Sequence, residues 1–156
     1  MVVVADTSPI NYLVLIGQIE ILPRLYTEIL IPHAVLEELK HPVAPEPVRD
    51  WAAYPPSWLE VLTPKRSLTL EQLDLGETEA IALAIEMHAE VLLIDDQAGR
   101  QEAARRGLKV AGTLSILDEA DQAGFVNFDA ALAILRQTSF RVSQAVVAQI
   151  KERRSR

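Results

Sequence analysis

Cysteine is absent from this 156-residue chain, and aromatic residues make up only 5% of it. Without cysteine there is no disulfide, no thiol nucleophile and no cysteine-ligated zinc or iron–sulfur site. No apolar run approaches the roughly 18 residues that a membrane span needs. The apolar start also lacks the basic segment that begins a signal peptide. We therefore expect a cytoplasmic protein that does not associate with membranes.

Sequence motifs for several common chemistries are missing as well. The chain has neither of the glycine-rich loops that cradle nucleotide phosphates, G-x-x-x-x-G-K-[ST] and G-x-G-x-x-G, and it lacks the G-x-S-x-G of many serine hydrolases. The three histidines are not spaced one helical turn from each other, which disfavours a histidine-ligated metal. A phosphatase of the haloacid-dehalogenase type would need a second aspartate two residues after Asp6, where Ser8 stands.

Acidic residues outnumber basic ones by 22 to 15, which gives a net charge of −7 at pH 7. Such a chain does not bind nucleic acid by bulk charge alone, although a nuclease whose acids are neutralised by bound metal remains compatible with it. The sequence is 49% hydrophobic and has no internal repeat or low-complexity tract. We expect a single globular domain covering residues 1–156.

Apolar segments alternate with helical patterns along the chain. The segments predicted to be strands are Met1–Ala5, Glu28–Ile31, Leu59–Leu62, Val91–Ile94 and Leu108–Ala111. Those predicted to be helices are Ser8 to Leu15 or Ile16, Ile19–Leu25, His33–Lys40, Gly76–His88, Gln97–Arg106, Leu114–Ala123, Asp129–Gln137 and Ser143–Arg153. The proline-rich stretch His41–Pro56 is predicted to be a loop. The alternation predicts an α/β fold with a parallel sheet.

Acidic residues follow two of the predicted strands directly. Asp6 ends the first, and Asp95 with Asp96 ends the fourth. Ligands in parallel α/β sheets bind outside the carboxyl ends of the strands, so we expect these carboxylates to lie at the functional edge.

Two helical acids should point toward the same region. At about 100° per residue, Glu77 lies on the apolar stripe of its helix and Glu79 on the far side. Glu38 flanks the apolar arc of its own helix, whereas Glu37 points away. Converging carboxylates repel one another unless a divalent cation holds them, and oxygen ligands suit magnesium or manganese.

Each of these acids also has a purely structural explanation. Glu77 at a helix N-terminus is favoured by the helix dipole, and Glu38 can be a boundary residue. Asp6 and the pair Asp95-Asp96 can cap the helices that follow them. It is the convergence of all of them that favours a metal site.

Five segments of the chain together resemble the PIN-domain family: MVVVADTSPI, IPHAVLEEL, LDLGETEAIALAI, VLLIDDQAGR and GLKVAGTLSIL, spread over about Val2–Ala123. The segments around LDLGETEAIALA and LLIDDQAGR are most similar to a prokaryotic subgroup close to the VapC-type toxins, which are magnesium- or manganese-dependent ribonucleases. The resemblance implies a three-layer α/β/α sandwich with the strand order 3-2-1-4-5. It also implies frequent homodimers.

Residue by residue, the resemblance makes Asp6 the first metal ligand and Ser8 its hydroxyl helper. Glu38 matches the second acid and Glu77 the third, where relatives often carry aspartate. Asp95 matches the fourth acid, or Asp96 does if one residue is inserted after Glu77.

The expected function is therefore a metal-dependent endoribonuclease, the toxin of a type II toxin–antitoxin pair. Mg²⁺ or Mn²⁺ is the expected cofactor, and RNA and an antitoxin protein are the expected partners. Arg100, on the helix that follows the acidic pair, is the basic residue expected nearest the substrate. The apolar faces of the last two helices favour a homodimer or an antitoxin groove, with ordinary packing as the alternative. A PIN-fold interaction module with weak or no activity remains the main alternative function, and an acid-rich phosphatase a third.

Overall fold

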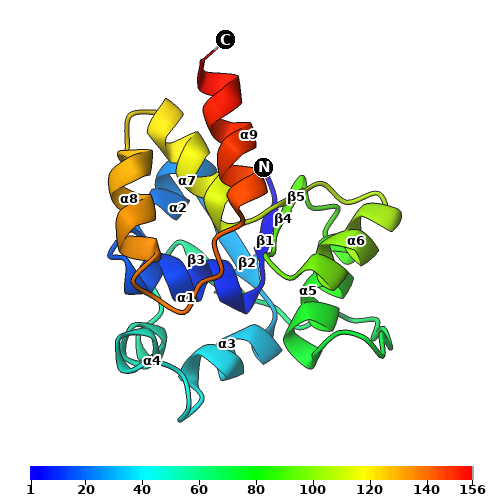
Figure 1. Ribbon diagram of the computed structural model, residues 1–156. Coiled ribbons are helices and arrows are strands. Elements are labelled where there is room, and N and C mark those ends of the chain that lie inside the picture. Colours follow the sequence, from blue (N-terminus) through cyan, green and yellow to red (C-terminus); the bar gives the residue numbers. More distant parts are fainter. Residues whose placement is uncertain (156) are drawn as a thin grey trace.

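Five short strands form an all-parallel sheet at the centre of the computed structural model, which describes residues 1–155 (Figure 1). The strands are β1 (Val3–Ala5), β2 (Ile29–Ile31), β3 (Leu59–Val61), β4 (Val91–Leu93) and β5 (Val110–Ala111), in the spatial order β3-β2-β1-β4-β5. This order confirms the expectation. Because β1 and β4 pair in the middle, with Ala5 opposite Leu93, the acidic residues that follow them emerge side by side.

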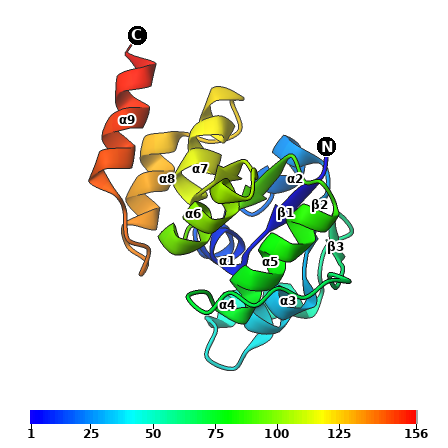
Figure 2. The same ribbon diagram turned by 90° about the vertical axis from the view of Figure 1, so that its right-hand side faces the viewer.

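Helices cover both faces of the sheet and make the fold three-layered (Figures 1 and 2). One face packs against α5 (Leu75–Glu86) and α6 (Gln97–Arg105). The other face packs against α1 (Thr7–Leu15), α2 (Ile21–Tyr26), α3 (His33–Lys40), α4 (Glu46–Ala53), α7 (Thr113–Gln122), α8 (Phe128–Leu135) and α9 (Gln144–Arg154). The central strands are buried on both faces, which explains their continuous apolar sequences.

Helix α4 corrects the sequence prediction, since it lies inside the segment that was expected to be a loop. Pro45 is its N-cap and Pro47 lies in its first turn, where a missing backbone N–H costs little. Val48 and Ala52, one turn apart, are fully buried. The prolines therefore begin a helix here rather than interrupt one. The other predicted helices and strands are present, with ends within two residues of those expected.

Residues 136–155, called here the C-terminal arm, run from the end of α8 past α1 and then form α9. Val147 and Ile150 attach α9 to the main core, and Figure 2 shows α9 at the outer edge of the molecule. Most of the larger apolar side chains of α8 and α9 are buried within the chain itself, namely Phe128, Leu132, Leu135, Val147 and Ile150, although Ile134 is 44% exposed. Ordinary packing thus accounts for most of the apolar surface that suggested a dimer. Within residues 1–155, no helix is long and apolar enough to span a membrane.

Candidate active site

A pocket of about 940 Å³ opens at the carboxyl ends of the central strands. Six acidic side chains line it: Asp6, Glu38, Asp74, Glu77, Asp95 and Asp96. They come from the ends of β1 and β4, from α3 and from the start of α5. Ser8 and Arg100 line the same pocket. The structure therefore brings together every side chain that the sequence singled out.

Asp6 lies deepest of these acids, with only 4% of its surface exposed. Its Oδ1 atom is buried and accepts no hydrogen bond from any residue that the structure describes. Burial raises the pKa of Asp6 well above its usual value, and the nearby charges of Glu77, Asp74 and Glu38 raise it further. A buried acceptor without a donor is energetically costly, so this oxygen favours a proton or a cation.

Glu38 is held in the pocket by contacts on both sides. Its Oε2 accepts a hydrogen bond from the Thr7 hydroxyl. A Cβ atom on Gly76 would lie 2.6 Å from both carboxylate oxygens, so the glycine lets Glu38 pack against the start of α5. Burial raises the pKa of Glu38. Its neighbour Glu37 instead pairs with His33 on the surface at 3.3 Å, as the helical phase predicted.

Glu77 faces the pocket while it also caps its own helix. Its backbone N–H donates to Asp74 Oδ1 at 2.8 Å, and its Oε1 accepts from the backbone N–H of Asp74 at 3.0 Å. This capping box gives Glu77 a structural role besides the helix-dipole interaction that the sequence suggested. Burial raises the pKa of Glu77 to about 7, and the charges of Asp74 and Asp96 contribute. Glu79 does not line this pocket.

Asp95 and Asp96 have different local roles. Asp95 accepts hydrogen bonds from the Ser8 hydroxyl at 2.8 Å and from the backbone N–H and hydroxyl of Thr113, both at 2.7 Å. It therefore connects the residues that follow β1, β4 and β5. Asp96 is the N-cap of α6 and accepts from the Gly99 N–H at 2.9 Å, which is the structural role proposed for it.

Several pocket residues were missed by reading the sequence. Asp74 was one, although the spacing from Asp74 to Glu77 is the capping-box signature at the start of an apolar helix. Thr113, which is fully buried after β5 and donates to Asp95 without lining the pocket itself, was also missed. The arm residues Phe140 and Arg141 also line the pocket, and no local pattern predicts that contact.

The donor chemistry of the pocket suits a hard divalent cation. Its candidate ligands are carboxylate oxygens, and Oδ1 of Asp6 has no hydrogen-bond partner among residues 1–155. Within the residues that the structure describes, however, no group of three or more His, Cys, Asp or Glu side chains is arranged so that it could hold one ion. Rotation of the half-exposed carboxylates, Glu77 above all, would be needed to complete a coordination sphere.

A comparison with models of known protein families identifies the family of this chain. The family model for DUF3368, described as a PIN domain, matches residues 2–156. The chain belongs to this family of PIN domains. Proteins with a PIN domain are typically metal-dependent nucleases, and the acidic pocket lies where a parallel α/β sheet places its functional site.

Solved structures support the same fold. This PIN domain is similar to a PilT N-terminus domain protein from the hyperthermophilic archaeon Sulfolobus solfataricus P2, with a TM-score of 0.51 and 16% identity. The similarity covers 92% of this chain and all of the archaeal one. No curated protein matches the chain.

Proposed function

We propose that this PIN domain is a metal-dependent endoribonuclease and that the acidic pocket is its active site. One observation carries the proposal. Asp6, at the end of a central strand, lies in a pocket lined by five further acids, and its buried Oδ1 accepts no hydrogen bond from the residues that the structure describes. A structural aspartate would be satisfied by donors of the chain, whereas a ligand for a cation keeps an oxygen free.

Asp6, Glu38 and Glu77 are the residues that would hold the cation, together with Asp95 or Asp96. When bound, a divalent cation lowers the pKa of a water molecule and neutralises charge on the phosphodiester. Carboxylate oxygens suit both Mg²⁺ and Mn²⁺.

Neighbouring side chains orient the ligands and the substrate. Thr7 fixes Glu38, while Ser8 and Thr113 fix Asp95, so two carboxylates are held by hydroxyl groups before a substrate arrives. Such preorganisation lowers the entropic cost of assembling the site. Arg100 lines the pocket beside these acids and supplies a positive charge for a phosphate oxygen.

The biological role we propose is that of a VapC-like toxin in a type II toxin–antitoxin pair, acting in the cytoplasm as a homodimer. The motifs around Glu77 and Asp95 support this subgroup by resemblance. The adjacent open reading frame tests it: a short, DNA-binding-like protein encoded there is expected, and its absence would contradict the toxin role.

A second function has its own support, namely an interaction module without catalysis. Both oxygens of Asp95 are already engaged by hydrogen bonds, and Glu77 takes part in a capping box. A site whose acids serve the fold in this way does not require a metal.

Cleavage of single-stranded RNA separates the two functions. Protein stripped of metal by a chelator is incubated with RNA, with and without added Mg²⁺ or Mn²⁺. Wild-type protein and the surface control Glu37→Gln should cleave only with metal, whereas Asp6→Asn and Glu38→Gln should not cleave. Cleavage that persists in Asp6→Asn, or no cleavage by the wild type with either metal, would refute the nuclease.

A further inference from the structure

The pocket has a second part that holds no acidic residue. Three segments build it: α1 through Asn11 and Tyr12, α6 through Arg100 and Gln101, and the C-terminal arm through Ser139, Phe140, Arg141, Ser143 and Val146. We propose that this part is a subsite for the single-stranded nucleotides that flank the scissile phosphodiester, with Arg141 as a phosphate contact and Phe140 as a stacking surface. This inference rests on the proposed ribonuclease function and assigns it residues outside the acidic cluster.

The spacing of the lining residues shows that two helices present a continuous polar face to this region. On α1 the lining residues Ser8, Asn11 and Tyr12 are three and four positions apart, and on α6 the same holds for Gln97, Arg100 and Gln101. Residues so spaced lie on one face of a helix. Over four residues the axis advances about 6 Å, so each face extends away from the carboxylates.

The charge of this region differs from that of the whole chain. The chain carries a net charge of −7, yet the lining residues beyond the acidic cluster include two arginines, Arg100 and Arg141, and otherwise only neutral side chains. No ion pair occupies either arginine among the residues that the structure describes. Free guanidinium groups next to amide and hydroxyl side chains suit the sugar–phosphate backbone of a nucleic acid.

Aromatic side chains lie in the same part of the pocket. Phe140 packs edge-on against Tyr12, with ring centroids 5.0 Å apart and an interplanar angle of 77°. The Tyr12 hydroxyl is 2.8 Å from Ser139 Oγ, which fixes the arm against α1. Phe140 is only partly buried, so part of its ring remains accessible in the pocket. Aromatic faces beside a basic groove are the usual platform for unpaired bases.

Unpaired bases are the substrate feature that this arrangement recognises. A duplex keeps its bases stacked inside the helix, whereas a single strand can place a base on Phe140. The proposed occupant is therefore a single-stranded segment of RNA whose backbone passes Arg141.

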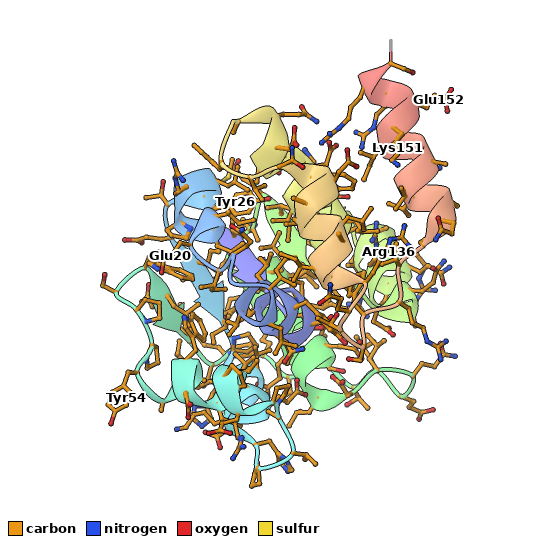
Figure 3. The ribbon with its side chains drawn as sticks, turned by 60° about the vertical axis from the view of Figure 1, so that its left-hand side comes forward. Glu20, Tyr26, Tyr54, Arg136, Lys151 and Glu152 are labelled. Carbon is orange, nitrogen blue, oxygen red and sulfur yellow. The ribbon has the colours of Figure 1, made fainter. Side chains whose placement is uncertain are left out.

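The experiment measures binding of a fluorescent single-stranded 12-nucleotide RNA by anisotropy, in a chelating buffer so that no metal-dependent cleavage occurs. The proteins are wild type, Arg141→Gln, Phe140→Leu and the control Arg136→Gln. Arg136 follows α8 on the same arm (Figure 3), and it is not among the residues that line the pocket. Circular dichroism checks that each variant is folded.

Arg141→Gln should weaken binding at low salt and lower the slope of log K against log salt by about 0.7, as expected for one lost phosphate contact to a single strand. Phe140→Leu should weaken binding by about tenfold while leaving the weaker binding of the corresponding duplex unchanged. Arg136→Gln should behave as wild type.

Three results would overturn the subsite. One is an Arg141→Gln variant that binds RNA with the affinity and salt slope of the wild type. Another is an equal loss of RNA affinity in Arg136→Gln, which would mean that the positive charge of the arm attracts RNA without a defined subsite. The third is failure of the wild type to bind single-stranded RNA. The first two leave metal-dependent cleavage intact, so they are distinguishable from failure of the nuclease function itself.

Discussion

Asp118 is the residue on which docking of the C-terminal arm depends most. It lies on α7 and is 3% exposed, and it accepts hydrogen bonds from Arg153 at 3.1 Å and from Arg154 at 2.8 and 3.1 Å. Hydrogen bonds to charged groups contribute about 1.5–3 kcal/mol. The two arginine side chains are 62% and 32% exposed, so both can return to water when the aspartate is neutralised. We therefore expect Asp118→Asn to cost about 2 kcal/mol, toward the lower end of that range.

The loss should appear locally, because few other contacts hold α9. A cost of about 2 kcal/mol corresponds to about a 30-fold increase in the open population of the arm. Amide hydrogen exchange at Val147 and Ile150 should accelerate by that factor, while the amides of β1 and β4 keep their protection. Asp50→Asn, an exposed substitution on α4, is the control. Unchanged exchange in α9 would refute the role of the ion pairs, and equal acceleration in the sheet would show that Asp118 supports the whole core.

Three further predictions concern the acidic pocket. Gly76→Ala should lower cleavage at least tenfold, because the new Cβ would lie 2.6 Å from the Glu38 carboxylate and displace it. It should cost little stability, because alanine favours the helix more than glycine does. RNA cleavage measures the first effect and thermal unfolding the second. Without metal, Asp6→Asn should be more stable than wild type above neutral pH. Because the pKa of Asp6 is raised in the folded state, wild-type stability falls as pH rises from the ordinary carboxyl pKa toward the raised one, and a denaturant series at pH 5 and 8 measures the fall. Glu77→Ala should lose cleavage while Glu79→Ala keeps it, and the reverse order would contradict the helical phase.

The sequence predicted the sheet and much of the pocket because those features depend on local patterns. A buried valine-rich strand that ends at Asp6 places that carboxylate at the sheet edge, and helical periodicity distinguishes Glu38 from Glu37. These inferences need only the direction of a strand and the angle per residue of a helix.

The remaining features depend on contacts between distant parts of the chain. Phe140 meets Tyr12 across 128 positions, so nothing near residue 140 indicates that the arm lines the pocket. Helix α4 was missed because prolines that begin a helix resemble prolines that end one. The buried pair Val48 and Ala52 was the available signal, and it was too short to outweigh five prolines in the same stretch.

The most direct test of the central claim, that these carboxylates hold a divalent cation, is thermal unfolding during a titration with Mn²⁺ at pH 7.5. A ligand that binds only the folded state at 100 times its dissociation constant stabilises that state by about 2.7 kcal/mol. The unfolding midpoint of the wild type should therefore rise with Mn²⁺ and reach a shift of several degrees, whereas Asp6→Asn should show little or none. A wild-type midpoint that does not move, or an equal rise in Asp6→Asn, would contradict the metal site.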